Sequence, residues 1–348
     1  MSRYDSLVED CALSIGAEAS TFAALGNTRI LITGGTGFVG SWVAEMIAFL
    51  NDRHKLGVHL TLLSPHASEF SERAPHLAGR SDITLMEGDV RNISAVPTDT
   101  DWIIHAAGSP DSRIHLSNPI RTMETIVLGT QNVMQAAARI GALKRILVLS
   151  SGLVCGPQQW ESAPLSEESY SGMDCNRLAN LYAESKRAAE MIATGYRSQT
   201  GLPVVTARPF TFIGPYQLLD RPWAINNFLG EALRGGPIRL QGNGSTVRSY
   251  MYGSDMAYWM LRLLVDGRIG AAYNIGSPQG ISLKELAGMV ADFAESHPRI
   301  ELNTLPGGEL HRSRWLPDVT KAEKDCGLKV RIGLDAAIRR TIAWHTGK

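Results

Sequence analysis

Tyr182 and Lys186 form a Y-x-x-x-K pair whose side chains are suited to acid–base chemistry. On a helix, residues four apart share one face, so the phenol and the ammonium would lie together. The pKa of a free tyrosine is about 10, too high for a general base at neutral pH. A neighbouring ammonium stabilises the phenolate and lowers that pKa. The spacing therefore predicts proton transfer at Tyr182, although a solvated tyrosine above a surface lysine would show the same spacing.

Ser151 supplies a third polar group for the same chemistry. It follows the apolar run at 145–149 (RILVL), which predicts a buried strand. Ligands of open α/β sheets bind at the carboxyl ends of the strands, so this hydroxyl is expected to face a ligand. It can donate a hydrogen bond to a substrate oxygen or accept one, and it can orient the phenol of Tyr182.

A glycine-rich turn earlier in the chain is the element expected to bring a ligand to these groups. Residues 29–40 read RILITGGTGFVG, and Gly34, Gly37 and Gly40 lie between an apolar run and apolar residues at helical spacing from 42 to 50. A strand–turn–helix junction of this kind points backbone N–H groups at one place, which favours a pyrophosphate. The alternative is a tight turn that binds no ligand.

Strands alternate with helices through the first two thirds of the chain. Besides the run before Gly34, the apolar pattern predicts strands at 58–63, 83–87, 102–105, 145–149 and 204–207. Helices are predicted at 119–140 and 176–200. This order predicts an α/β fold: a Rossmann-type, doubly wound parallel sheet with a smaller C-terminal substrate-binding lobe.

Three segments are expected from this pattern. Residues 1–27 form an N-terminal extension with a short amphipathic helix, and residues 28–208 form the dinucleotide-binding Rossmann domain. Residues 209–348 are rich in proline and glycine at first and form the substrate-binding lobe, with 250–265 and 273–275 returning to the sheet. Amphipathic helices are expected at 281–297 and 333–345.

Composition excludes several classes of protein. The 348 residues are 44% hydrophobic and 20% charged, enough for a sizeable core, and 34 basic residues balance 34 acidic ones. Zero net charge gives no general attraction to nucleic acid or an anionic membrane, and neither a membrane span nor a signal peptide is evident. The four cysteines are far apart and the histidines lack ligand spacing, so no metal site is expected. A reducing, cytoplasmic location is the default.

Further motifs follow the glycine turn in a fixed order. They are Gly88-Asp89-Val90, His105-Ala106-Ala107, Ser150-Ser151 with Val154 and Gly156, Arg208-Pro209-Phe210 with Gly214-Pro215, and Arg248-Ser249-Tyr250 with Tyr252 and Asp255. With Tyr182 and Lys186, they make residues 28–345 resemble the extended short-chain dehydrogenase/reductases. Within that group, the resemblance is to the NAD-dependent epimerase/dehydratase family, which acts on nucleotide sugars.

The resemblance implies an enzyme with NAD or NADP as cofactor and a nucleotide-diphosphate sugar as substrate. It implies that Ser151, Tyr182 and Lys186 are catalytic. The cofactor contacts it implies are Gly34, Thr36, Gly37, Phe38, Val39, Ser64, Asp89, Val90, Ala106, Ala107, Tyr182, Lys186 and Pro209. The expected substrate contacts are Ser109, Arg113, Ser151, Thr211, Asn227 and Arg248, with Arg248 at the diphosphate. A surface salt bridge at Arg248 and an ordinary polar loop at 111–113 are the alternatives.

Departures from the family pattern bear on the reaction. Members that eliminate water carry an acidic pair after the catalytic hydroxyl residue, because elimination needs one acid and one base. This chain has Gly152 and Leu153 there, so a 4,6-dehydratase is disfavoured; decarboxylating members also tend to carry a glutamate there. Cys155 replaces a usual tyrosine, and Thr211 and Ile126 replace usual asparagines.

The form of the cofactor stays open in the sequence. No acid that would favour NAD ends the second strand, where the residues are Leu62-Leu63-Ser64-Pro65-His66. Glu69 is the first acid, and Arg73 lies nine residues beyond Ser64.

The sequence favours an epimerase that oxidises and re-reduces C4 of a nucleotide sugar through a 4-keto intermediate. The alternative is a nucleotide-4-keto-sugar reductase that uses the same residues once. A cofactor-binding protein without catalysis is a third hypothesis, which the complete Ser–Tyr–Lys set disfavours. A homodimer is expected through a helix pair that includes the helix of Tyr182.

Overall fold

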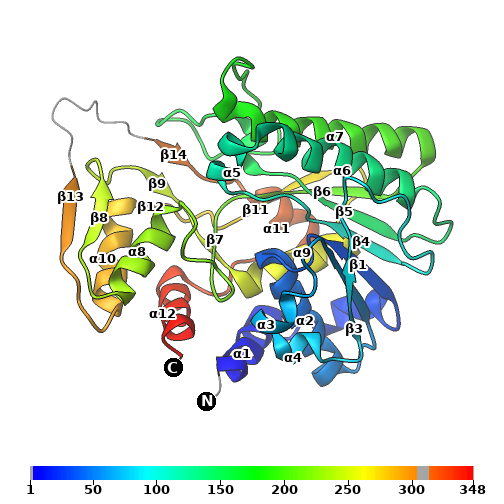
Figure 1. The fold of residues 1–348 in the computed structure, drawn as a ribbon, viewed down its shortest axis with the longest axis horizontal. Helices are drawn as coiled ribbons and strands as arrows, with labels where there is room; N and C mark the ends of the chain where they lie inside the picture. The colour runs from blue at the N-terminus through cyan, green and yellow to red at the C-terminus, as the bar shows by residue number, and fades with distance from the viewer. Residues whose placement is uncertain (1–2, 304–312, 348) are drawn as a thin grey trace.

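A seven-stranded parallel sheet forms the centre of the molecule in a computed structural model that describes residues 3–303 and 313–347 (Figure 1). The strand order is β11-β6-β5-β4-β1-β2-β3, and every neighbouring pair is parallel. The strands are β1 (Arg29–Thr33), β2 (His59–Ser64), β3 (Ile83–Glu87), β4 (Trp102–His105), β5 (Arg145–Leu149), β6 (Val204–Pro209) and β11 (Ala272–Ile275). The predicted Rossmann-type fold class is confirmed.

The apolar runs form strands because both faces of the sheet are covered. In β1, Ile30 and Ile32 belong to one hydrophobic cluster, whereas Leu31, between them, belongs to the cluster on the other face. Such strands read as continuous apolar runs instead of alternating with polar residues. The five strands predicted after β1 accordingly lie within two residues of their observed bounds.

Two layers of helices cover the sheet (Figure 1). One face carries α1 (Arg3–Ile15), α2 (Phe38–His54), α9 (Gly253–Asp266) and α11 (Thr320–Cys326), and the other carries α6 (Pro119–Ala137) and α7 (Leu181–Thr200). Short helices are η1 (Ala19–Leu25), α3 (Phe70–Arg73), α4 (Pro75–Ala78), α5 (Ser112–Ser117), η2 (Gly152–Cys155) and η3 (Leu178–Asn180). Within residues 3–303 and 313–347, no helix is long and apolar enough to cross a membrane.

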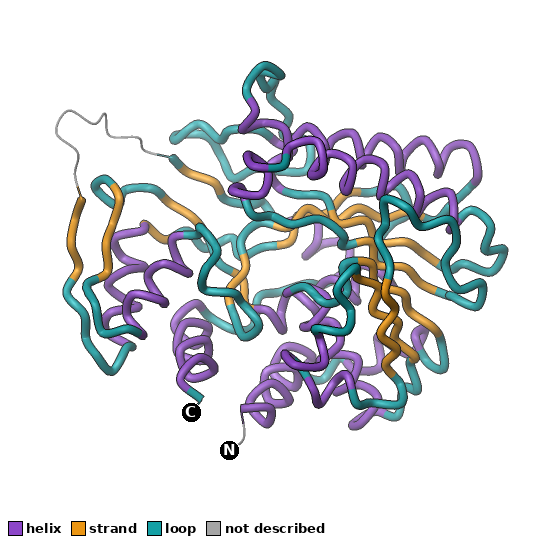
Figure 2. The backbone as a smooth tube through the Cα atoms, in the orientation of Figure 1, coloured by secondary structure: helices purple, strands orange, loops and turns teal. Residues whose placement is uncertain are grey.

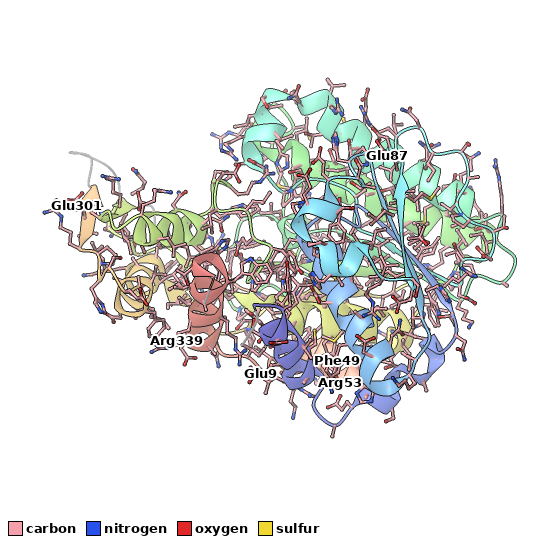
Figure 3. The ribbon with its side chains drawn as sticks, turned by 60° about the horizontal axis from the view of Figure 1, so that its bottom comes forward. Glu9, Phe49, Arg53, Glu87, Glu301 and Arg339 are labelled. Atoms are coloured by element: carbon pink, nitrogen blue, oxygen red, sulfur yellow. The ribbon has the colours of Figure 1, made fainter. Side chains whose placement is uncertain are left out.

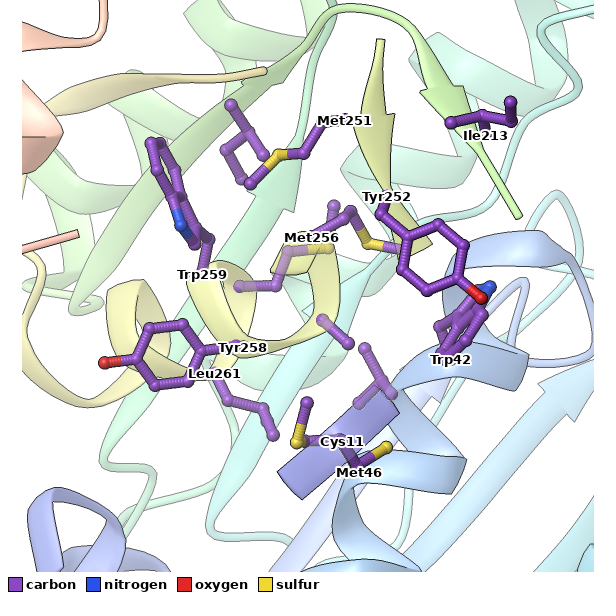
Figure 4. Packing of buried hydrophobic residues seen from close by; sticks show 14 of the residues in the cluster. Cys11, Trp42, Met46, Ile213, Met251, Tyr252, Met256, Tyr258, Trp259 and Leu261 are labelled. Atoms are coloured by element: carbon purple, nitrogen blue, oxygen red, sulfur yellow. The ribbon is translucent and has the colours of Figure 1, made fainter. Parts of the chain in front are cut away.

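The N-terminal helix α1 packs on α2 and α9, and is the amphipathic helix expected within residues 1–27. Leu7, Cys11 and Ile15 are buried in its interface, and Figure 4 shows Cys11 close to Met46. The carboxylate of Asp10 accepts a hydrogen bond from the Tyr252 hydroxyl at 2.6 Å. This segment is thus an integral part of the hydrophobic core.

A second group of elements lies beside the sheet, at the left of Figure 1. It comprises α8 (Ala224–Leu233), β8 (Ile238–Gln241), β9 (Val247–Arg248), β12 (Ile281–Ser282), α10 (Leu283–Phe293), β13 (Ile300–Asn303), β14 (Arg314–Trp315) and α12 (Leu334–Thr346). The two-stranded pair of β7 (Phe212–Ile213) and β10 (Met251–Tyr252) lies between this group and the sheet (Figure 1). The connecting segments are largely loops that cross the centre of the molecule (Figure 2).

The chain returns from this group to the sheet in two ways. Residues 272–275 add strand β11 next to β6, as predicted. Residues 253–266 return as helix α9, which packs on β5 and β6 without adding a strand. In addition, α10 begins at Leu283 instead of 281, because Ser282 and Glu285 form a capping box that fixes its first turn.

Trp42 joins the sheet to this second group of elements. Its indole lies edge-on to Tyr252, with ring centroids 5.3 Å apart (Figure 4), and donates a hydrogen bond to the Pro215 carbonyl oxygen at 3.0 Å. A Cβ on Gly253 would lie 2.1 Å from the indole nitrogen, so only glycine lets α9 begin this close to α2. The helix that follows the glycine turn is therefore fixed against the segment that follows β7.

Candidate active site

The glycine turn between β1 and α2 forms a backbone cradle. Gly34 has a φ of +68°, and a Cβ there would lie 2.8 Å from the Ala106 carbonyl oxygen. A Cβ on Gly40 would lie 2.0 Å from the Gly35 carbonyl oxygen, so the first turn of α2 also needs glycine. The first N–H groups of α2 lack intrahelical partners and carry the positive end of the helix dipole. The turn therefore fits the pyrophosphate of a dinucleotide.

Other residues predicted to contact a cofactor lie around this cradle at neighbouring strand ends. The Thr36 hydroxyl donates to the Ser64 hydroxyl oxygen at 2.9 Å, where β2 ends. Ala106 and Ala107 directly follow β4. Phe38 begins α2 and stacks parallel to Phe212 at 6.3 Å, facing the second group of elements.

Three further predicted cofactor residues lie at the ends of β3 and β6. Asp89 follows β3, and hydrogen bonding to the Arg91 guanidinium holds its pKa below the usual range. Val90 packs beneath Gly129, where a Cβ would lie 2.7 Å from its side chain. Pro209 ends β6, two strands from β4 in the sheet.

Ser151 and Tyr182 meet at the carboxyl edge of β5, as their sequence positions predicted. Ser151 directly follows β5 and caps η2 by accepting a hydrogen bond from the Leu153 N–H at 3.2 Å. The side chain of Ser151 lies near enough to the Tyr182 phenol to lower its pKa. Both residues are buried, so a substrate oxygen between these hydroxyls would be shielded from bulk water.

Lys186 lies one turn after Tyr182 on α7, and its ammonium is 5.9 Å from the centroid of the phenol ring. The Nζ atom donates to the Leu149 carbonyl oxygen at 2.7 Å, which fixes the side chain against the end of β5. Burial lowers the pKa of Lys186 to about 8. The predicted shared face of tyrosine and lysine is present.

The low pKa predicted for Tyr182 depends on two nearby cations, Lys186 and an oxidised nicotinamide, and only the first belongs to the protein. Burial raises the pKa of the phenol to about 12, and the nearby Ser151 side chain offsets only part of that rise. Lys186 does not reverse it, because its ammonium lies over the ring and is itself desolvated. Tyr182 is therefore a neutral phenol at pH 7 in the protein alone.

His115 is a neighbour of Tyr182 that sequence reasoning missed. Its ring stacks on the phenol ring with centroids 4.3 Å apart and planes inclined by 10°. The His115 Nε2 lies 2.7 Å from the Ser109 carbonyl oxygen, so this nitrogen carries the proton. Burial lowers the pKa of His115, which keeps the ring neutral. No spacing in the sequence marks this contact, because α5 and α7 meet only in the folded chain.

His105 is a core histidine. Its ring nitrogens lie 2.7 Å from the Thr33 hydroxyl and 3.0 Å from the Thr130 hydroxyl, and burial lowers its pKa to about 3. Thr130 also donates to the Ile126 carbonyl oxygen at 2.5 Å. This chain of hydrogen bonds ties β1 and β4 to α6, where Ile126 replaces the family's usual asparagine.

Gly152 and Leu153 occupy the positions where eliminating members of the family carry acids. A Cβ on Gly152 would lie 2.5 Å from the Phe210 ring. That ring is stacked on Trp315 with centroids 4.4 Å apart, so it cannot move aside freely. Leu153 is largely exposed and has no titratable group. The site thus has neither an acid at these positions nor space for one at 152.

Arg248 is partly buried and pairs with no carboxylate among the described residues. Its guanidinium donates to the Val247 carbonyl oxygen at 2.8 Å and to the Ser313 hydroxyl at 3.0 Å. Burial lowers its pKa, so the charge is poorly solvated. A surface salt bridge, the alternative considered for this residue, is not found among the described residues, and the arrangement fits an anionic group.

The other predicted substrate residues differ in how far their side chains are exposed. Thr211 follows β6 and is partly buried, and Ser109 follows β4 and is partly buried. Arg113 is about half exposed and paired with Asp111 at 2.8 Å. Asn227 is exposed on α8, whereas the buried amide of that helix is Asn226. The side chains of Arg113 and Asn227 therefore do not join the Ser151–Tyr182 cluster without moving.

Asp111 links this region to the second group of elements. Its buried carboxylate accepts from Arg113 and, at 2.8 Å, from Arg221, which holds its pKa well below the usual range. In the described parts of the chain, no group of three or more histidine, cysteine or acidic side chains is arranged to hold a metal ion.

Comparison with known proteins gives one family match. Residues 30–276 match the family described as "NAD dependent epimerase/dehydratase family". The NAD dependence in this description confirms that the expected cofactor is a nicotinamide dinucleotide.

Individual relatives with this fold have different activities. UDP-glucuronic acid decarboxylase 3 of Arabidopsis thaliana is 30% identical over 309 residues, which cover 88% of this chain and 86% of that protein. The structure of UDP-glucuronic acid 4-epimerase from Bacillus cereus, in complex with UDP-glucuronic acid and NAD, has a TM-score of 0.78 at 21% identity and covers 92% of this chain and 99% of that one. The structure of DesIV, a dTDP-glucose 4,6-dehydratase from Streptomyces venezuelae, has a TM-score of 0.74 at 25% identity. It covers 92% of this chain and 97% of that one.

Proposed function

The chain belongs to the NAD-dependent epimerase/dehydratase family, and we propose that it is a nucleotide-sugar epimerase that inverts C4 through a 4-keto intermediate. The observation that carries the proposal is the buried cluster of Ser151, Tyr182 and Lys186 beside the glycine turn, with Gly152 and Leu153 in place of an acid–base pair. These residues suffice for one reversible proton transfer next to a redox cofactor and offer nothing for elimination.

Each residue of the cluster has a distinct role in this proposal. Ser151 holds the C4 oxygen by a hydrogen bond, and Tyr182 takes its proton and later returns it. Lys186, held by the Leu149 carbonyl oxygen, places a positive charge over the phenol ring. A nicotinamide held beside this cluster would supply reversible hydride transfer at C4.

The substrate in this proposal is a nucleotide-diphosphate sugar. The 30% identical relative from Arabidopsis is named for a UDP-sugar, which supports this class. Arg248 is the candidate for the diphosphate, because it is desolvated and lacks a carboxylate partner among the described residues. Decarboxylation, the activity in that relative's name, is disfavoured because the glutamate common in decarboxylating members is missing at 152 and 153.

A nucleotide-4-keto-sugar reductase is the second candidate, and one observation favours it. The pKa of Tyr182 is about 12, so the phenol is protonated at pH 7 and ready to donate to a ketone oxygen. An epimerase begins with the opposite transfer. The two functions therefore differ in the protonation state from which turnover starts.

We propose a homodimer formed through the α6–α7 face. These helices pack side by side, and Ile120, Met123 and Leu128 on α6 and Met191 on α7 are exposed large apolar side chains. A second copy of the chain presenting the same face would remove them from water.

The four cysteines are all unpaired, which supports a reducing, cytoplasmic location.

Cofactor accounting tests the function. An epimerase interconverts a pair of nucleotide sugars without net consumption of added reduced cofactor. Stoichiometric oxidation of reduced cofactor with a nucleotide-4-keto sugar would identify the reductase instead. Release of CO2 from UDP-glucuronic acid, or of water from a nucleotide hexose, would contradict both proposals.

A further inference from the structure

We propose that the cofactor site accepts a 2′-phosphate, so that the protein binds NADP(H) in preference to NAD(H). The site consists of Ser64 at the end of β2, Arg73 at the end of α3 and the backbone of Thr36 in the glycine turn. The inference deepens the proposed function and rests on it, because it names the form of the cofactor that serves the Ser151–Tyr182 cluster.

Ser64 takes the position at which an acid would select NAD. The end of the second strand lies beside the adenosine ribose in this fold, and an aspartate or glutamate there binds the 2′-hydroxyl. The Ser64 hydroxyl oxygen accepts hydrogen bonds from the Thr36 hydroxyl at 2.9 Å and the His66 backbone N–H at 3.3 Å. Its own proton has no acceptor among the described residues, so it is available to a ligand.

Arg73 is nine residues from Ser64 in the sequence but returns to the glycine turn in the fold. The segment after β2 forms the single-turn helix α3, and the Nη2 atom of Arg73 donates to the Thr36 carbonyl oxygen at 2.8 Å. Its guanidinium also lies 5.9 Å from the Phe70 ring centroid. Two independent contacts, Arg73 to Thr36 and Thr36 to Ser64, thus bring a cation and a free hydroxyl proton to the ribose end of the site.

The positive charge of Arg73 is not neutralised by a carboxylate in the part of the chain that the structure describes. Arg73 is exposed and forms no ion pair with a carboxylate in residues 3–303 and 313–347. Glu69, the nearest acid in sequence after Ser64, is 3.4 Å from the imidazole of His66. Glu87 pairs with Ser64 across β2 and β3, but its side chain is exposed. An unpaired guanidinium with several free N–H groups suits a phosphate, which accepts charge-assisted hydrogen bonds.

A direct binding measurement tests the proposal without turnover. Isothermal titration of the full chain with NADP+ and NAD+, and with the fragments 2′,5′-ADP and 5′-AMP, isolates the contribution of the 2′-phosphate. We expect at least tenfold tighter binding of each phosphorylated partner, and a ratio that falls as salt is added. Equal affinity, or tighter binding of NAD+, would overturn the inference.

Variants test which side chains form the site. Arg73→Gln is expected to abolish most of the preference for 2′,5′-ADP, and Ser64→Asp to reverse it toward NAD+. Arg53→Gln is the matched control, because Arg53 lies at the far end of α2, beside Phe49 and Glu9 and away from Glu87 (Figure 3). A ratio unchanged in Arg73→Gln, or altered equally in Arg53→Gln, would contradict the assignment.

The outcome is separable from that of the proposed function. Tyr182→Phe is expected to keep the binding ratio of NADP+ to NAD+ while losing turnover. Loss of turnover without any 2′-phosphate preference would reject this inference and leave the proposed function standing. A clear preference for the 2′-phosphate together with full turnover in Tyr182→Phe would reject the proposed function and leave this inference standing.

Discussion

The imidazole ring of His115 lies flat against the phenol ring of Tyr182, with centroids 4.3 Å apart and planes 10° from parallel. The imidazole Nε2 donates a hydrogen bond to the Ser109 carbonyl oxygen at 2.7 Å, which fixes the ring. Since burial is the main cause of the high pKa of Tyr182, the ring that covers it helps to set that pKa. We therefore expect His115 to position the phenol.

Replacing His115 tests this role. His115→Ala should admit water to the phenol and move the pKa of Tyr182 down from about 12, with kcat falling roughly tenfold or more because the phenol is less well held. His115→Phe keeps a flat ring and should retain most of the activity. The basic limb of the pH–kcat profile and an ultraviolet titration of tyrosinate report the shift. Identical profiles for the alanine and phenylalanine variants would contradict the positioning role.

Tyr182→Phe should lower kcat by about 10²- to 10⁴-fold, the usual contribution of general acid–base catalysis. Only the hydroxyl is removed and the stack with His115 remains, so the free energy of unfolding should change little. Turnover and thermal melting are measured on the same preparations. Wild-type kcat in the variant would show that proton transfer uses another group.

Gly152→Ala should destabilise the protein by about 1–3 kcal/mol, because overpacking forces neighbours to shift. The added Cβ would lie 2.5 Å from the Phe210 ring, which is itself stacked on Trp315. Gly172→Ala is the matched control, since a Cβ there meets nothing within 4 Å. Urea unfolding measures both, and equal stability of the two variants would show that the Phe210 ring yields easily.

Asp10 should make stability fall as pH rises between about 4 and 6. Burial raises its pKa from 3.8 to about 6, although Tyr252 and Arg340 partly offset this. In that window the native state holds a proton that the unfolded chain has released, so the native state binds more protons and loses stability with rising pH.

The variant Asp10→Asn lacks this titration and supplies the reference. The unfolding free energy of the wild type relative to the variant should decrease by up to about 3 kcal/mol from pH ~4 to pH ~7. Urea titrations at several pH values measure the difference. A difference that stays constant with pH would mean that Asp10 has the same pKa in the folded and unfolded chain.

Met191→Lys should convert a dimer to a monomer in sedimentation velocity at micromolar concentration. The side chain is 69% exposed on α7, and a charge there would face its partner across the proposed α6–α7 interface. Met191→Leu keeps the apolar surface and should remain dimeric. A monomeric wild type would reject the interface at once.

The sequence predicted correctly those features that depend on residues close together in the chain. The strands are buried on both faces and read as apolar runs, and Tyr182 and Lys186 are one helical turn apart. Contacts between distant segments left no such pattern, as with His115 on Tyr182. The contact of Arg73 with the glycine turn left none either, because the single turn of α3 has no periodicity to recognise. The pKa of Tyr182 depends on how completely packing excludes water, which spacing alone does not reveal.

The docking of α1 has a consequence for the order in which the chain acquires its structure. Ser14 bonds to Asp255, 241 positions later, and Asp10 pairs with Arg340, 330 positions later. Helix α1 can therefore complete these contacts only after those later segments have been synthesised. Closing such long loops is slow. Until then α1 can pack only on α2, and the part of its apolar side that contacts α9 stays exposed to water.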